Sequence, residues 1–186
     1  MSGRIKRERG GGIGITLAPG EAEVIRRAFG DLLELFDSHA EHGEVEEIAP
    51  GVPNPFGAPG SDVLPEDPAL ARLLPDAYPD DPEASSEYRR YTETDLISRK
   101  KVHIAVLLSG LDKVGPDGRL HVPADHVPAW LMALNDLRLA LGTRLEIEED
   151  YEAMIAKLPR DDPRLPAYAL YEWLTWLQDS LVRTQR

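Results

Sequence analysis

The chain has 186 residues, of which 42% are hydrophobic and 29% charged, and this length and balance are typical of one globular domain with a sizeable core. Its formal net charge of −12 means that the surface as a whole repels nucleic acid and anionic membranes, so any DNA contact has to be local. There is no cysteine, which excludes a thiol nucleophile, a cysteine-ligated metal, a disulfide framework and thiol-based redox sensing.

A β-hairpin is predicted near the beginning of the sequence. Residues 4–9 are a short mixed segment, residues 10–12 are glycines that can turn, and Ile13, Ile15 and Leu17 alternate with small or polar residues. The basic start is not followed by the apolar region of a secretory signal, and no apolar run approaches the roughly 20 residues that span a bilayer. We therefore expect a soluble, cytoplasmic protein without membrane contact.

Apolar residues at helical spacing predict six or seven helices after the hairpin. Thr92, with Asp95 three positions on, resembles a capping box and is expected to begin one of them. Gly142 is expected to end another. Residues 120–122 are expected to add a short strand to the hairpin, and residues 144–147 look extended. The expected helices cover residues 19–36, 68–74, 83–90, 92–111, 125–141, 149–158 and 165–183.

The sequence thus predicts a mainly α fold, with six to seven helices around one core and a small N-terminal antiparallel β-hairpin or three-stranded sheet. We expect one domain over residues 1–186, with a flexible loop at about 39–64. Residues 50–60 contain four prolines and three glycines, too many for a helix or a central strand. The last helix, residues 165–183, is apolar almost all round, so it is expected to be central to the core or to form half of a homodimer interface.

Charge is unevenly distributed along the chain. Residues 41–95 hold fourteen acidic and three basic residues, and this stretch either solvates a loop or docks on a basic partner, such as RNA polymerase or a sigma factor. No helix-turn-helix or other base-reading motif is legible, so DNA contact by the chain alone is expected to be weak. Two basic groups either contact phosphates or are solvated surface: Arg4, Lys6 and Arg7 in the N-terminal arm, and Arg99, Lys100 and Lys101 on a helix.

A compact polar group interrupts the apolar run of residues 130–142. Nine of these thirteen residues are apolar, and Asn135, Asp136 and Arg138 lie between them. These side chains either bind a ligand or partner, or they form an internal hydrogen-bond network, since buried polar groups have to be satisfied and an Asp–Arg pair does this well. An enzyme would need Asp136 and Arg138 in an open pocket with a shifted carboxyl pKa, and this is the weakest interpretation.

No catalytic constellation, metal site or cofactor motif is legible elsewhere. The chain has five histidines, and none has the spacing of a structural or catalytic zinc site. The serines and threonines of residues 85–94 are better interpreted as caps than as nucleophiles, since no histidine lies in a suggestive context. We therefore expect neither a catalytic residue nor a bound metal or cofactor.

Three segments together resemble one known family. They are residues 70–82 (LARLLPDAYPDDP), residues 87–96 (EYRRYTETDL) and residues 130–147 (WLMALNDLRLALGTRLEI). Their order and spacing are similar to those of the actinobacterial AosR-like family, formerly catalogued as a domain of unknown function. The NDLRL core is the most specific part. The N-terminal hairpin and the first helix fit as well, so the resemblance covers most of the chain.

The resemblance implies a transcriptional regulator of the oxidative-stress response. Redox sensing in such a regulator is linked to a cysteine pair, which this chain lacks, so its switch cannot operate by disulfide formation. Besides Met1, only Met132 and Met154 offer oxidisable sulfur. We expect a non-enzymatic regulator that acts mainly through protein contacts. The alternative is an adaptor or structural interaction protein of actinobacterial stress or proteolysis pathways, without DNA binding.

Overall fold

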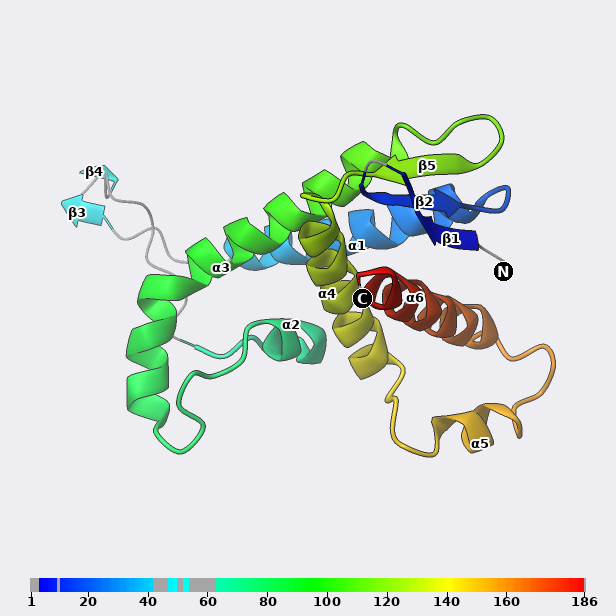
Figure 1. Cartoon of the computed structure of the whole chain (residues 1–186). Helices are drawn as coiled ribbons and strands as arrows, with labels where there is room; N and C mark the ends of the chain where they lie inside the picture. The colour runs from blue at the N-terminus through cyan, green and yellow to red at the C-terminus, as the bar shows by residue number, and fades with distance from the viewer. Residues whose placement is uncertain (1–3, 10, 42–46, 50–51, 54–62, 186) are drawn as a thin grey trace.

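The computed structural model describes residues 4–9, 11–41, 47–49, 52–53 and 63–185. These residues form six helices and two small antiparallel sheets (Figure 1), which confirms the predicted mainly α fold with a three-stranded sheet near the N-terminus. The helices are α1 (Glu21–Glu41), α2 (Pro68–Leu73), α3 (Pro82–Leu111), α4 (Val127–Arg144), α5 (Tyr151–Ile155) and α6 (Leu165–Thr184). The strands are β1 (Arg4–Arg7), β2 (Ile13–Thr16), β3 (Glu47–Ala49), β4 (Val52–Pro53) and β5 (Arg119–Val122).

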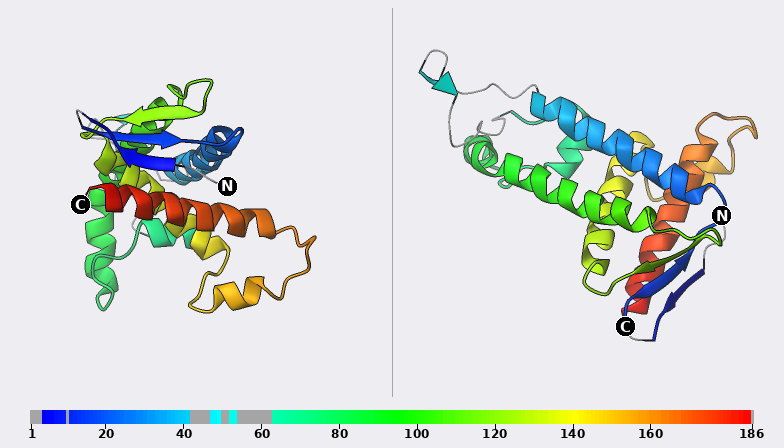
Figure 2. Two further views of the ribbon diagram at one scale, coloured as in Figure 1. Left: turned by 45° about the vertical axis from the view of Figure 1, so that its right-hand side comes forward. Right: turned by 90° about the horizontal axis from the view of Figure 1, so that it is seen from above.

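The three-stranded sheet has the order β1-β2-β5, with both pairs antiparallel. Ile15 lies at its centre and pairs with Ile5 on one side and Leu120 on the other. The turn before β5 requires a glycine, because Gly118 has a φ of 75° and a Cβ there would collide with the carbonyl oxygen of Leu17. Figure 2 shows this sheet at one end of the molecule, beside the last turns of α6.

The predicted loop at 39–64 is partly regular. α1 continues to Glu41, and β3 and β4 pair as a two-stranded antiparallel sheet. The remaining parts of this predicted loop, residues 42–46, 50–51 and 54–62, lie outside the described residues.

Helix α3 corrects the prediction of two helices separated at Thr92. The helix begins after Asp81, whose Oδ1 accepts a hydrogen bond from the backbone N–H of Ala84 (3.0 Å), and it runs without interruption to Leu111. The hydroxyl of Thr92 does not cap a helix. It donates instead to the carbonyl of Tyr88 (2.8 Å), one turn back in the same helix. Such bonds bend helices, and the first turns of α3 run at a steep angle to the rest (Figure 1).

The end of α4 also differs from the prediction. The helix continues through Gly142 to Arg144, so residues 144–147 are not an extended segment. The glycine serves packing, since a Cβ there would lie 3.2 Å from the ring of Tyr171 on α6. The chain leaves the helix through Glu146, which has a positive φ of 52°. The next helix, α5, is shorter than the predicted range of residues 149–158.

Helix α4 is the centre of the packing. It contacts α2, α3 and α6, and it crosses α3 where Gly110 lets the indole of Trp130 approach (Figure 1). Burial on several sides explains why its sequence is apolar nearly all round. The core also takes Phe29 and Phe36 from α1, both fully buried, and replacing either by alanine is expected to cost about 3–5 kcal/mol.

Candidate interaction site

Asp136 and Arg138 do not pair with each other, although such a pair was one way in which the internal network considered above could satisfy both charges. The side chain of Asp136 is 7% exposed, and its Oδ1 accepts a hydrogen bond from the ammonium of Lys100 at 2.7 Å. This lysine comes from α3, so the pair joins the two helices where they cross. Residues that are two apart on a helix point in different directions, which is why Asp136 and Arg138 cannot face each other.

Arg138 is bonded to α6 instead. Its Nε donates to the hydroxyl of Thr175 (2.9 Å) and its Nη1 donates to the side-chain oxygen of Gln178 (2.5 Å). The guanidinium carbon also lies 5.5 Å from the ring centroid of Tyr171, which is within cation–π distance. Asn135, the third member of the predicted polar group, is half-buried. Both charged members are therefore bonded within the chain.

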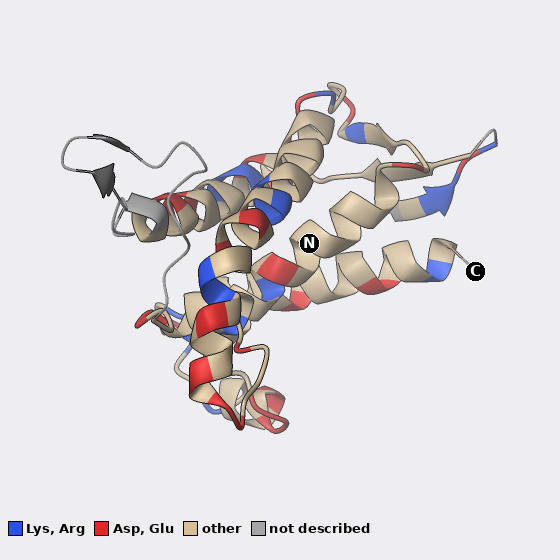
Figure 3. Ribbon diagram, turned by 90° about the vertical axis from the view of Figure 1, so that its left-hand side faces the viewer, with Lys and Arg blue, Asp and Glu red and all other residues tan. Residues whose placement is uncertain are grey.

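The two predicted basic groups do not form one surface. Lys101 pairs with Asp37 on α1 (2.5 Å) and Lys100 with Asp136, so two of the three residues in the predicted basic group on α3 have internal acidic partners. Lys6 and Arg7 are exposed on β1. Arg4 belongs to the same strand, and its side chain lies outside the described part of the structure. Figure 3 shows basic and acidic residues interspersed along the helices.

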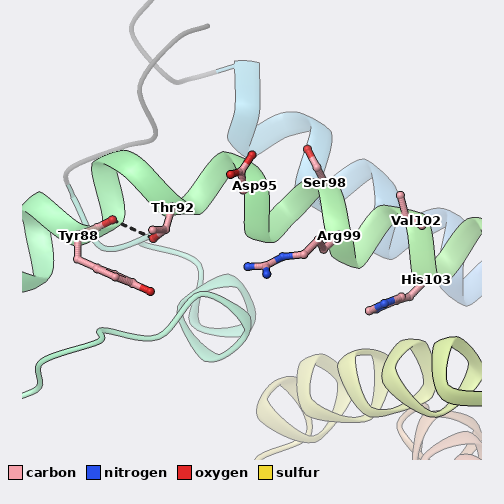
Figure 4. A pocket seen from close by; sticks show the side chains of 7 residues that line it. All are labelled: Tyr88, Thr92, Asp95, Ser98, Arg99, Val102 and His103. Atoms are coloured by element: carbon pink, nitrogen blue, oxygen red, sulfur yellow. Dashed lines mark hydrogen bonds between the residues drawn. The ribbon is translucent and has the colours of Figure 1, made fainter. Parts of the chain in front are cut away.

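Arg99, the remaining basic residue of the α3 group, lines a groove on the outer face of this helix. The groove has a volume of about 380 Å³, and in Figure 4 Tyr88 and Arg99 extend toward one another along one flank, whereas Asp95 and Val102 lie on the other. Every residue that lines it belongs to α3: Tyr88, Thr92, Asp95, Ser98, Arg99, Val102 and His103.

A buried charged network holds the bent part of α3 in place. Arg89 donates to the carbonyl of Leu74 (2.9 Å), to Glu93 (3.3 Å) and to Asp76 (2.5 Å). The other carboxylate oxygen of Glu93 lies 2.9 Å from Nε2 of His39 on α1. Arg89 and Glu93 are both buried, so the network fixes α3 against α1 and the chain after α2. The spacing of four between Arg89 and Glu93 is a signal that sequence reasoning could have used.

A second hollow, of about 620 Å³, lies between α4 and α6. Arg72 and Arg138 line it together with Glu146 and Glu148, so both signs of charge are present, but Asp136 is not part of it. The pocket that the enzyme interpretation required, with Asp136 and Arg138 together, is therefore not formed here. Burial and the carboxylate of Glu172 raise the pKa of the nearby Tyr151 hydroxyl above its ordinary value.

Among the described residues, two features are absent: a cluster of metal-holding side chains and a membrane-spanning helix. No group of three or more histidine, aspartate or glutamate side chains in this part of the chain is arranged to hold a metal ion. Among the same residues, no helix is long and apolar enough to cross a membrane.

The sequence matches a family model described as a domain of unknown function, DUF2017, over residues 2–185. It is 36% identical over 183 residues to a protein named oxidative stress regulator AosR from Mycobacterium tuberculosis (strain ATCC 25618 / H37Rv), which covers 90% of this chain and 79% of the relative. The AosR of Mycobacterium bovis gives the same values, and a putative oxidative stress regulator AosR of Mycobacterium leprae is 32% identical over 182 residues, with the same coverage. No solved structure matches the chain.

Proposed function

The chain belongs to the DUF2017 family and, because the relatives of known name are oxidative stress regulators, we propose that it is a non-enzymatic, cytoplasmic regulator of the oxidative-stress response. The observation that carries this proposal is the 36% identity to AosR over 90% of the chain. Identity at this level over nearly the whole length implies a shared fold, and the shared biological role is the inference.

Protein contacts are proposed as the main mode of action. The net charge of −12 disfavours approach to DNA, and Lys100 and Lys101 are already engaged by aspartates. The exposed Lys6 and Arg7 on β1 leave room for a weak local phosphate contact. A partner such as RNA polymerase or a sigma factor would then supply most of the affinity for a promoter.

The oxidant signal cannot reach this chain through a disulfide of its own, because the sequence has no cysteine. The proposal therefore places the sensing step on a partner, or has this chain regulate without sensing. The name of the relatives states that they regulate the response to oxidative stress. It does not state that every protein of the family senses the oxidant itself.

The test is co-precipitation of the tagged chain from its native host, with and without peroxide, combined with chromatin enrichment. RNA polymerase or a sigma factor in the eluate, together with promoter enrichment, would support the regulator. Protease or metabolic partners without promoter enrichment would favour the adaptor. Purified protein that bound promoter DNA tightly at physiological salt would contradict the partner-dependent mode, and a Lys6→Glu/Arg7→Glu variant would then show whether β1 makes the contact.

A further inference from the structure

The outer face of α3 exposes three large side chains, one of which, Tyr88, also packs edge-to-face against Tyr78, with ring centroids 6.0 Å apart. Tyr88, Tyr91 and Val102 are 50%, 70% and 60% exposed, and the groove that Tyr88 and Val102 help to line is made by α3 residues only. Single exposed apolar residues are normal, but several along one face of one helix mark an interaction surface. This face, from Tyr88 to His103, is called the α3 seam below.

The spacing of the α3 seam fits another helix. Its central positions, Tyr88, Thr92, Asp95, Arg99 and Val102, follow each other at intervals of four, three, four and three residues. This alternation is the heptad pattern by which two helices pack side by side. Because the first turns of α3 run at a steep angle to the rest (Figure 1), the straight part of the seam is the part after Thr92, from Asp95 to His103. With a rise of 1.5 Å per residue, this part is about 12 Å long, slightly more than two turns of a partner helix.

The charges at the centre of the α3 seam identify the partner. Asp95 and Arg99 lie next to each other on the exposed surface, have opposite charges, and form no ion pair with any described residue. A uniformly basic partner helix would repel Arg99, and a uniformly acidic one would repel Asp95. A surface that satisfies both presents an acidic and a basic residue in the reverse order, as α3 of a second copy does when it runs antiparallel.

We propose that the α3 seam is a homodimer interface, in which α3 of a second copy lies antiparallel across it. A two-fold axis beside Ile97 brings Asp95 opposite Arg99 of the partner subunit and Arg99 opposite Asp95 of the partner subunit. Such mutual pairing is the property of an isologous interface, in which both copies use the same patch.

This inference replaces the last helix as the expected dimer interface. The apolar face of α6 is used inside the chain, where Trp173, Leu174, Leu177 and Leu181 are buried. The inference does not depend on the proposed regulatory role, because self-association can be measured on the purified chain alone.

Charge reversal tests the proposal by light scattering coupled to size exclusion and by sedimentation equilibrium of the full chain. The wild type is expected to be a dimer. Because of the two-fold symmetry, Asp95→Arg and Arg99→Asp each turn both intersubunit ion pairs into pairs of like charge. Each variant is expected to raise the dissociation constant at least about tenfold. The double variant Asp95→Arg/Arg99→Asp restores both pairs with exchanged signs and is expected to dimerise again.

Matched controls come from α1, where Arg27 and Asp31 are exposed and also four residues apart. Arg27→Asp and Asp31→Arg are expected to leave the dimer unchanged, and circular dichroism shows that each variant is folded. A monomeric wild type would overturn the proposal. So would a dimer that survives Asp95→Arg, or folded single variants that lose the dimer without rescue by the double variant.

The lack of cysteine provides a second, independent test. A thiol introduced by Ser98→Cys lies one residue from the two-fold axis. The two thiols of a dimer are therefore offset by about 3 Å along the helices. A short bis-maleimide is expected to link them. Ser109→Cys lies about 36 Å from its counterpart along the helices and is expected to remain unlinked. Equal cross-linking of both variants, or of neither, would contradict the antiparallel arrangement.

Discussion

Replacing Lys100 by methionine is expected to destabilise the fold by about 3 kcal/mol, the lower end of the range for breaking a buried ion pair. The carboxylate of Asp136 is only 7% exposed, and Lys100 is its one ion-pair partner among the described residues, at 2.7 Å. Methionine keeps most of the volume of the lysine stem but leaves the charge buried and unpaired. At about 2–4 °C per kcal/mol, the melting temperature should fall by about 6–12 °C.

The assay is urea unfolding followed by circular dichroism, in which the midpoint should fall while the slope stays unchanged. The adjacent Lys101→Met is the matched control. It breaks the pair with Asp37, whose side chain is 62% exposed, and is expected to cost at most about 1 kcal/mol. A third variant, Lys100→Met/Asp136→Leu, removes both charges and should recover much of the loss. Equal effects of Lys100→Met and Lys101→Met would refute the reasoning, because burial would then not decide the cost.

Further predictions concern the network, a turn and one exposed pair. Arg89→Met leaves the buried carboxylate of Glu93 without its guanidinium and should cost about 3 kcal/mol in urea unfolding, whereas Arg27→Met on the exposed face of α1 should change stability by less than about 0.5 kcal/mol. Gly118→Ala should lower the free energy of unfolding more than Gly20→Ala. Both glycines have a positive φ, but of the two only the Cβ at Gly118 would meet a backbone atom, the carbonyl oxygen of Leu17. Equal losses of stability would show that backbone strain alone decides the cost. The hydrogen bond from the side chain of Arg164 holds the pKa of the Asp162 carboxyl below its ordinary value, so this contact stabilises the fold above the carboxyl's unfolded pKa and is lost as the pH falls through the folded pKa. In a ¹³C NMR titration, Arg164→Met should raise the pKa of Asp162, and an unchanged titration would contradict this cause.

The sequence predicted the helices where local signals were sufficient. Prolines in the first turn mark the beginnings of α2, α3 and α6, and the apolar spacing fills the helices that follow them. Thr92 was misinterpreted because its hydroxyl has two local options. It can cap a new helix, or it can bond back to the carbonyl four residues earlier, and the choice depends on whether Arg89 and Glu93 can both be buried against α1 and the chain after α2.

The partners of the polar residues could not be predicted from spacing on one helix. Lys100 and Asp136 are 36 positions apart, and Lys101 and Asp37 are 64 apart, so each pair depends on which helices cross and where. The α3 seam was present in the sequence as a four-three alternation. It was not recognised because the expected break at Thr92 divided it between two helices.

The positions of the sulfur atoms limit how an oxidant could act on this chain. Met132 on α4 is exposed, whereas Met154 is half-buried near the hydroxyl of Tyr168, so peroxide would reach Met132 first. Neither methionine lies in the α3 seam, which contains tyrosine, valine and charged side chains that peroxide attacks slowly if at all. In the proposed regulator the dimer would therefore persist under oxidative stress, and the oxidant-dependent step would belong to the partner that the dimer binds.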